Sequence, residues 1–286
     1  MGEWTKVEIK GAEFKEIIYE KKAFEGLGSA SRITINRPEK MNTITKTMQD
    51  EMGLCFMDSN LDPAVGVVIL TAVGDRVFSA GGDLTWESTT AYERDSISGV
   101  LELQRYMRAC SKPIIARVNG FAIGGGNHWA YFCDFTIAAE HAIFGQNGPR
   151  VGSPADGYLV QYLTRIIGQK RAREMWMLCR RYTAQEALQM GLVNAVVPME
   201  KLDDEVDKWC REILSLSPTC MRILKETFDR EIDRLRAGEF LIANEMAPGF
   251  FMSGEQHEAQ TAFFEKRSPN FAKYRKVAAS YEPPAK

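Results

Sequence analysis

The chain has 286 residues, of which 45% are hydrophobic and 26% are charged, and 36 basic residues stand against 38 acidic ones. This length and hydrophobic fraction suffice for one large buried core, with or without a smaller appendage. A formal net charge of −2 excludes a global field that would attract nucleic acid or an anionic membrane. No apolar run approaches the roughly 20 residues that a membrane-spanning helix needs. The opening stretch, MGEWTKVEIKGAEFKE, lacks the apolar core of a secretory signal, so we expect a cytoplasmic protein.

Strand and helix signals alternate through the first part of the chain. Short β-branched runs bounded by Gly, Pro or Asn predict buried strands at 31–38, 65–74, 112–120 and 134–140. Two segments of helix length, 44–62 and 96–111, each place apolar side chains on one face. Strand, helix and strand in repetition predict an α/β architecture with parallel pairing.

The pattern changes after about residue 200, where helical periodicity continues with few strand signals. We therefore divide the chain into an α/β core at 1–200 and a helical C-terminal region at 201–286. The last stretch, KVAASYEPPAK, has no periodicity and is expected to be a loose tail.

The six cysteines at 55, 110, 133, 179, 210 and 220 mostly lie in apolar stretches. They form neither Cys-x-x-Cys pairs nor a spacing with histidine that is typical of a metal site. We expect free thiols in a reducing compartment and no metal.

Two glycine-rich turns follow predicted strands. One is Gly124–Gly126 in GFAIGGGNHWAYF, and the other lies in VFSAGGDL at 77–84. Bare backbone after a strand lets N–H groups approach a ligand closely. A Gly-x-Gly-x-x-Gly fingerprint and a phosphate-binding P-loop are both absent. The two turns thus predict a pair of N–H donors for one oxygen, as enolate or tetrahedral chemistry at a thioester requires, although each could also be only a tight structural turn.

Four ordered motifs together resemble the crotonase (enoyl-CoA hydratase/isomerase) superfamily over nearly the whole chain. They are INRPEKMNTIT (35–45), FSAGGDL (78–84), VNGFAIGGGNHWAYFCDFTIAAEHAIFGQNGPRVGS (118–153) and AQEALQMGLVNAVVP (184–198). Within the superfamily, three stretches, two of which overlap these motifs, are most similar to the branch of 1,4-dihydroxy-2-naphthoyl-CoA synthase and 2-ketocyclohexanecarboxyl-CoA hydrolase. These stretches are FGQNGPRVGS, GQKRAREMWMLCRRYTAQEA and FFEKRSPNFAKYR.

The resemblance implies a spiral of ββα units, with a C-terminal helical region that closes the active site and builds a homotrimer or homohexamer. It implies an acyl-CoA substrate and no tightly bound cofactor. The charge balance and the lack of a long apolar run predict no nucleic-acid or membrane partner. By position, the N–H groups of Ala80 and Gly125 would hold the thioester oxygen. Lys40 and Thr43 would lie beside the CoA nucleotide, and Asp83 and Leu84 would line the path of its adenine and pantetheine.

The acid/base residues depart from the family pattern. Hydratases of the superfamily use two glutamates, and the corresponding positions here are His128 and Gly148. Some members of the naphthoate synthase branch bind bicarbonate in place of the second glutamate. The matching residues Gln146, Gly148 and Trp176 imply that bicarbonate or another small anion could bind here, although Asn147 replaces the branch's threonine. Gln146 and Trp176 could equally serve local packing.

A carboxylate remains at Asp156. The synthase branch has its aspartate one position earlier, at Ala155, and a tyrosine where this chain has Phe251. Asp156 instead matches the nucleophilic aspartate of the superfamily's 4-chlorobenzoyl-CoA dehalogenase. It could abstract a proton, activate water or attack directly, or it could be a turn residue in PADG. His128 could share the acid and base roles with Asp156, or be a histidine of the core.

Aromatic residues are expected to line the acyl pocket and to favour a ring over a straight chain. They are Trp86, Tyr92, Trp129, Tyr158 and Phe251. The polar segment 85–99 is expected to form a mobile lid.

The leading hypothesis is an enzyme that hydrates or hydrolytically opens an alicyclic or aromatic-derived acyl-CoA, such as a β-oxo thioester. Two alternatives remain open at this point. One is the ring-closing naphthoyl-CoA synthase reaction. The other is a member that binds acyl-CoA, or associates with RNA, and has lost its chemistry.

Overall fold

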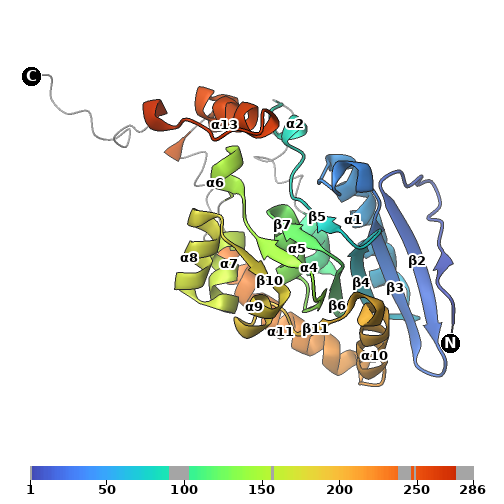
Figure 1. The fold of residues 1–286 in the computed structure, drawn as a ribbon. Helices are drawn as coiled ribbons and strands as arrows, with labels where there is room; N and C mark the ends of the chain where they lie inside the picture. Colours follow the sequence, from blue (N-terminus) through green and yellow to red (C-terminus); the bar gives the residue numbers. More distant parts are fainter. Residues whose placement is uncertain (1, 90–102, 156–157, 238–245, 248, 275–286) are drawn as a thin grey trace, which may run out of the picture.

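The computed structural model describes residues 2–89, 103–155, 158–237, 246–247 and 249–274 (Figure 1). The strands are β1 (Thr5–Lys6), β2 (Ile17–Phe24), β3 (Gly28–Ile35), β4 (Val65–Ala72), β5 (Val77–Ser79), β6 (Ile114–Val118), β7 (Phe121–Ile123), β8 (Phe135–Ala139), β9 (Ile143–Gly145), β10 (Arg181–Thr183) and β11 (Ala195–Val197).

The α-helices are α1 (Lys46–Leu61), α2 (Leu84–Glu87), α4 (Leu103–Ala109), α5 (Gly125–Phe132), α6 (Gly148–Val151), α7 (Tyr158–Ile167), α8 (Gln169–Leu178), α9 (Ala184–Gln189), α10 (Leu202–Leu214), α11 (Pro218–Ala237) and α13 (Gly254–Phe264). Short 3-10 helices are η1 (Pro38–Lys40), η2 (Met199–Lys201), η3 (Phe250–Met252) and η4 (Ala272–Tyr274).

In the described part of the chain the strands form two sheets. The larger has the order β1-β2-β3-β4-β6-β8-β11, antiparallel from β1 to β3 and parallel from β3 onward. The smaller has the order β10-β9-β7-β5 and is parallel except at β10. The predicted α/β class with parallel pairing is therefore confirmed.

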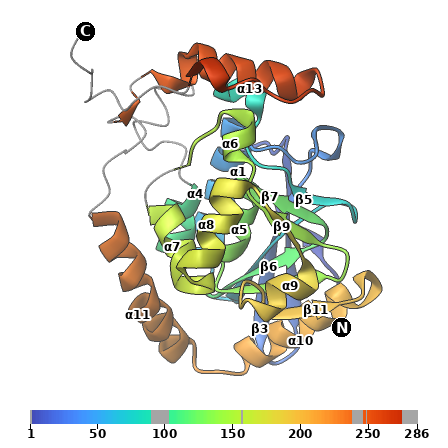
Figure 2. The same ribbon diagram turned by 60° about the vertical axis from the view of Figure 1, so that its left-hand side comes forward.

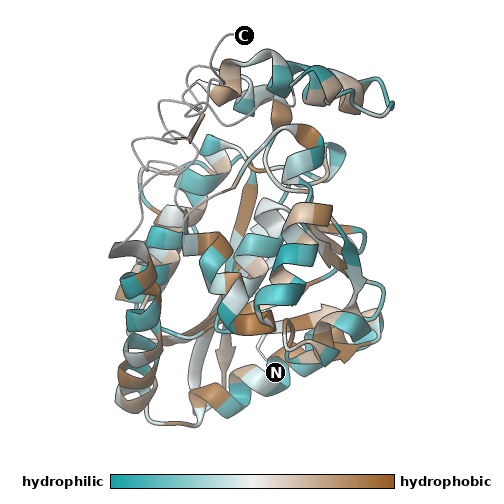
Figure 3. Ribbon diagram, turned by 90° about the vertical axis from the view of Figure 1, so that its left-hand side faces the viewer, coloured by the Kyte–Doolittle hydropathy of each residue, from teal (hydrophilic) through white to brown (hydrophobic). Residues whose placement is uncertain are grey.

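The core has two parts, one on each face of the larger sheet. One face packs against the smaller sheet and helices α1, α5, α7 and α8, with Tyr19, Phe56, Leu70, Trp129 and Phe144 buried. The other face packs against α10. In Figure 3 the helices on the near side mix polar and apolar residues along their length.

The hairpin of β2 and β3 was not foreseen from the sequence, because Lys21 and Lys22 interrupt the apolar pattern of β2. Both ammonium groups are paired in the structure. Lys21 lies 2.7 Å from carboxylates of Asp58 and Asp62, and Lys22 binds Asp207 on α10. Partners far away in the sequence therefore make this charged strand possible.

The C-terminal helices take two different positions. Helix α11 runs down one side of the body and α13 lies across its top, near α2 and α6 (Figures 1 and 2). A Cβ atom on Gly152, at the end of α6, would lie 2.9 Å from Cβ of Ala259 on α13, so the two helices are in close contact. The predicted helical C-terminal region is confirmed, and residues 276–286 lie outside the described residues.

The segment predicted to be a mobile lid begins as ordered structure. Asp83 caps α2 by accepting a hydrogen bond from the N–H of Thr85 at 3.1 Å. Two buried side-chain amides of α13 then contact the backbone of α2, Gln260 Nε2 at 3.4 Å from Leu84 O and Gln256 Nε2 at 3.5 Å from Glu87 O. The remainder of that segment, 90–99, lies outside the described residues, as does the first part of the helix predicted at 96–111.

All six cysteines are free. Five are buried, and Cys220 on α11 is exposed. Burial raises the pKa of the Cys210 thiol to about 12. Among the described residues no helix is long and apolar enough to cross a membrane, and no group of three or more His, Cys, Asp or Glu side chains could hold a metal ion.

Candidate active site

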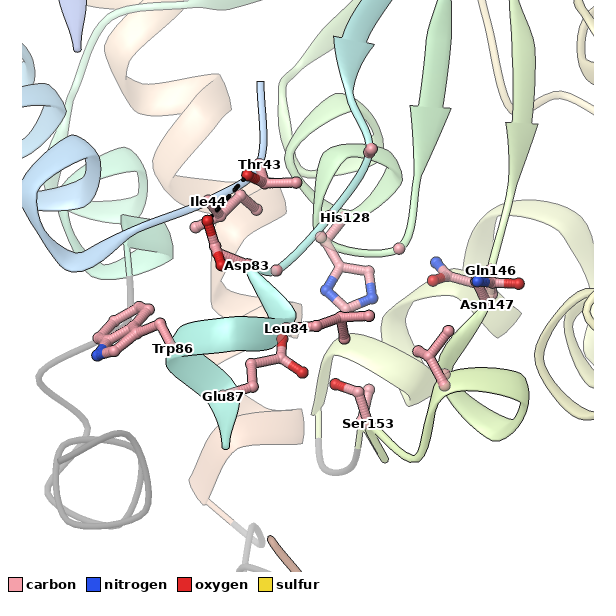
Figure 4. A pocket seen from close by; sticks show the side chains of 18 of the residues that line it. Thr43, Ile44, Asp83, Leu84, Trp86, Glu87, His128, Gln146, Asn147 and Ser153 are labelled. Atoms are coloured by element: carbon pink, nitrogen blue, oxygen red, sulfur yellow. Dashed lines mark hydrogen bonds between the residues drawn. The ribbon is translucent and has the colours of Figure 1, made fainter. Parts of the chain in front are cut away.

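A cavity of about 570 Å³ lies where the turns after η1, β5, β7 and β9 meet. The residues that line it include Lys40, Met41, Thr43, Ile44, Ala80–Glu87, Gly124–Gly125 with His128 and Trp129, Gln146–Gly148, Ser153–Ala155, Tyr158, Trp176, and Phe263–Phe264. The cavity thus brings together most residues that the sequence singled out, and Figure 4 shows several of their side chains around it.

The two glycine-rich turns meet at one wall of this cavity. A Cβ atom on Gly81 would lie 3.0 Å from the carbonyl oxygen of Ile123 and 3.2 Å from the nitrogen of Gly125. The φ angles of Gly81 and Gly124 are +97° and +57°, which side-chain-bearing residues rarely adopt. Glycine is needed here both for the close approach and for the backbone conformation.

The free N–H donors at this wall are those of Gly82 and Gly125. Gly125 is the first residue of α5, whose N-cap Gly124 offers no side chain to bind it. No hydrogen bond joins either N–H group to another group in the described part of the chain. A Cβ atom on Gly125 would lie 3.8 Å from the nitrogen of Gly82, so the two groups are neighbours.

The Ala80 N–H, assigned from the resemblance, is already engaged. It donates to the carbonyl oxygen of Met41 at 3.1 Å. That bond fixes the loop after η1 against β5, and the donor next to Gly125 comes from Gly82, two residues later. The sequence signal for Gly82 was present as the second glycine of SAGGD.

His128 projects from α5 into the middle of the cavity (Figure 4). Its ring is buried, and burial lowers its pKa to about 4, because a low-dielectric site disfavours the imidazolium form. The Nε2 atom has no hydrogen-bond partner in the described part of the chain. His128 is therefore uncharged at neutral pH and presents an unpaired nitrogen.

Gln146 and Trp176 place further unpaired polar atoms in the cavity wall. Oε1 and Nε2 of Gln146 and Nε1 of Trp176 are buried without a partner among the described residues. The Trp176 ring centroid lies 5.1 Å from that of His128. Leaving a buried polar group unpaired costs on the order of 1–3 kcal/mol, so these atoms are suited to binding a polar ligand or water.

Glu87 is a site residue that sequence reasoning missed. It ends α2, its side chain is buried, and it points into the cavity toward Ser153 (Figure 4). Burial raises the pKa of its carboxyl to about 7, although a hydrogen bond with Ser153 opposes the rise. Asp83 followed by LTWE is a recognisable helix start, but the polar residues that follow it favoured the prediction of a loop.

Thr43 and Asp83 come together at one side of the cavity. The Thr43 hydroxyl donates to the Asp83 carboxylate at 3.2 Å. Arg37 binds both, at 2.7 Å from the Thr43 carbonyl and 3.5 Å from the Asp83 carboxylate. Lys40 is exposed, and both Lys40 and Leu84 line the cavity.

The aromatic residues expected in the pocket are only partly there. Trp86, Trp129 and Tyr158 line the cavity, and Phe251 does not. Phe251 is buried in η3 against the ring of Phe250, and it is Phe263 and Phe264 of α13 that reach the cavity. Tyr92 and Asp156 lie outside the described residues.

The chain is similar to known proteins over most of its length. Residues 26–274 match the family described as enoyl-CoA hydratase/isomerase. An enoyl-CoA hydratase from Mycobacterium avium subsp. paratuberculosis K-10 is 28% identical with a TM-score of 0.76, over 91% of this chain and 100% of that one. An enoyl-CoA hydratase from Bacillus anthracis is 29% identical with a TM-score of 0.68, over 90% and 98%. A methylmalonyl-CoA decarboxylase in complex with 2-nitronate-propionyl-CoA is 26% identical with a TM-score of 0.79, over 91% and 99%.

Proposed function

The chain belongs to the enoyl-CoA hydratase/isomerase family, and on that basis we propose that it hydrates, or opens by hydrolysis, an alicyclic or aromatic-derived acyl-CoA. A cyclic β-oxo thioester is the type of substrate we have in mind. The observation that carries the proposal is the pair of unpaired N–H groups, Gly82 and Gly125, at one wall of the cavity.

These donors suit a thioester oxygen that gains negative charge. In the enolate of an acyl-CoA that charge rests on the thioester oxygen, and each preorganised donor contributes about 10²- to 10³-fold in rate. The methylmalonyl-CoA decarboxylase similar to this chain binds a nitronate-bearing acyl-CoA, and a nitronate is planar and anionic like an enolate. This supports enolate stabilisation as the shared part of the chemistry.

The aromatic side chains that line the cavity support a ring-shaped substrate. Trp86, Trp129 and Tyr158 offer flat apolar walls. The two positions that carry glutamates in the family's hydratases hold His128 and Gly148. We assign the activation of water to Asp156 and His128, with the uncharged His128 orienting water through Nε2 rather than donating a proton.

One observation favours the ring-closing synthase reaction as a second candidate. The unpaired atoms of Gln146 and Trp176 belong to residues that line the same cavity as Gly148. An indole N–H and an amide N–H are suitable donors for bicarbonate or another small oxyanion. The same atoms would also suit a polar substituent of the substrate ring.

A small substrate panel tests these alternatives. The purified protein is incubated with 2-oxocyclohexanecarboxyl-CoA, a cyclohexenecarboxyl-CoA, o-succinylbenzoyl-CoA and crotonyl-CoA, and products are followed by liquid chromatography and mass spectrometry. We expect one of the first two to gain water, and fragmentation distinguishes hydration from ring opening. Loss of water from o-succinylbenzoyl-CoA would establish the synthase instead. Binding of these thioesters without any turnover would favour a non-catalytic acyl-CoA-binding member.

We further propose a cytoplasmic homotrimer or homohexamer. Free, buried cysteines support a reducing compartment. Ile223, Leu224 and Phe228 on α11 are 58%, 52% and 75% exposed, and adjacent exposed apolar side chains are typical of an interface. Light scattering coupled to size-exclusion chromatography should give three or six times the 32.2 kDa chain mass.

A further inference from the structure

We propose that the carboxyl group of Glu87 is the catalytic acid and base that exchanges a proton with the α-carbon of the bound acyl-CoA. This inference rests on the function proposed above, because it requires an acyl-CoA whose thioester oxygen lies on Gly82 and Gly125. It assigns a role to a residue outside the two glutamate positions of the hydratases.

The first argument is where the carboxyl group lies. A Cβ atom on Gly82 would stand only 1.7 Å from Oε1 of Glu87 and 2.8 Å from its Cδ. The carboxyl group therefore occupies the space that the missing side chain of Gly82 leaves free. Since Gly82 also supplies one donor for the thioester oxygen, Glu87 lies beside the atoms that react.

The second argument is the incomplete hydrogen bonding of this group. Oε2 is buried and has no partner in the described part of the chain. Ser153 is the polar side chain that favours the charged form of the carboxyl group. No cation is among the groups that influence its charge, so nothing described here neutralises it as a structural ion pair would. A carboxyl group with a free oxygen in a substrate cavity is available to the substrate.

The third argument is that the surroundings hold Glu87 in place without supplying charge. Helix α13 binds the backbone of α2 through the amides of Gln256 and Gln260. His128 on α5 lines the same cavity and is uncharged at neutral pH. Asp83, on the same turn as α2, disfavours the charged form of Glu87. With burial and Asp83 together, the pKa of Glu87 is about 7, so both protonation states are populated near neutral pH, as acid–base catalysis favours.

The step balances without any further reactant. The Glu87 carboxylate takes the α-proton, so that the C–H bond breaks and an O–H bond forms on Glu87. The electron pair moves into the enolate, whose oxygen rests on the N–H groups of Gly82 and Gly125. The reverse step returns the proton to the α-carbon. Hydration and hydrolytic ring opening both end with this protonation, with water as the second substrate.

The test measures proton exchange and binding separately. Wild type, Glu87→Gln and Glu140→Gln are incubated with cyclohexanecarboxyl-CoA in D₂O, deuterium at the α-carbon is followed by mass spectrometry, and affinity for the same thioester is measured by calorimetry. Glu140 is exposed, is not part of the cavity lining and undergoes the same loss of charge. We expect Glu87→Gln to lose at least about 100-fold in exchange rate, with affinity within about threefold of wild type, and Glu140→Gln to match wild type.

The outcomes are distinct. Exchange by Glu87→Gln within about threefold of wild type would overturn the role of Glu87 and leave the proposed function standing, as would binding by wild type without exchange. Absence of binding by wild type would overturn the proposed function and this inference with it.

A second variant tests the same role without changing Glu87, in case Glu87→Gln disturbs the folding of α2. Because the hydrogen bond from Ser153 lowers the pKa of Glu87, Ser153→Ala should move the midpoint of the pH–exchange profile upward, with exchange retained above it. An unchanged midpoint in a folded variant would count against Glu87 as the titrating base.

Discussion

The wall at Gly81–Gly82 and Gly124–Gly125 is made of backbone, whereas the rest of the cavity around Glu87, His128 and Trp176 is made of side chains. The backbone wall is fixed by close packing, since a Cβ on Gly81 would meet backbone at 3.0 Å. The side-chain region keeps several buried polar atoms unpaired. Under the proposed function, the backbone wall would supply oxyanion stabilisation, and the side-chain region would decide which reaction follows.

Replacing Gly125 by proline should have the largest effect on activity, because it removes one of the two N–H donors of the backbone wall. Gly125 is the first residue of α5, a position that accepts proline well, and the change removes its N–H donor. We expect kcat/KM on the active thioester to fall about 10²- to 10³-fold, measured by steady-state kinetics. Gly125→Ala is the matched control, because in both variants an added Cβ meets Cδ1 of Ile44 at 2.4 Å while alanine keeps the N–H. Equal losses in the two variants would argue against the donor.

Replacing Glu87 by glutamine should show how much the buried carboxyl group lowers the unfolding free energy at high pH. The pKa of Glu87 is raised from 4.5 to about 7 in the folded chain. Protonated Glu87 therefore stabilises the folded state, and this contribution is fully present below pH 4.5 and is lost as the pH rises through about 7. The unfolding free energy of Glu87→Gln minus that of wild type should rise by on the order of 3 kcal/mol between pH 4.5 and pH 8.5. Urea denaturation at the two pH values measures this gain, and a pH-independent difference would contradict it.

Replacing Trp176 by phenylalanine should have the smallest effect. It removes the unpaired Nε1–H and leaves most of the ring, so unfolding free energy should stay within about 1 kcal/mol of wild type. If that N–H binds substrate or bicarbonate, kcat/KM should fall about tenfold. Kinetics in carbonate-free buffer, with and without added bicarbonate, separates the two ligands, because only bicarbonate binding makes the wild-type rate depend on the addition.

Much of the fold could be predicted because it follows from local apolar patterns. The strand prediction at 65–74 corresponds to β4 (Val65–Ala72) and the helix prediction at 44–62 to α1 (Lys46–Leu61). Strand β2 could not be predicted this way, since its lysines depend on Asp58, Asp62 and Asp207. Pairings of that kind are invisible until the chain is folded.

The site was predictable where backbone conformation demanded glycine, and less so where side chains depend on distant contacts. The two glycine turns do converge, but only the bond from Ala80 to Met41 shows that Gly82 is the free donor. Glu87 belongs to a four-residue helix held by amides about 170 residues later in the sequence. The local sequence LTWE does not predict these hydrogen bonds.

The free cysteines of this chain offer a practical chemical handle. Five thiols are buried, and Cys220 is exposed on α11, the helix whose apolar side chains also face outward. A maleimide dye should therefore attach to one position of the separated subunit without any engineering. Because we expect α11 to lie between subunits, the dye should react with Cys220 more slowly in the assembled protein than after dissociation by dilution.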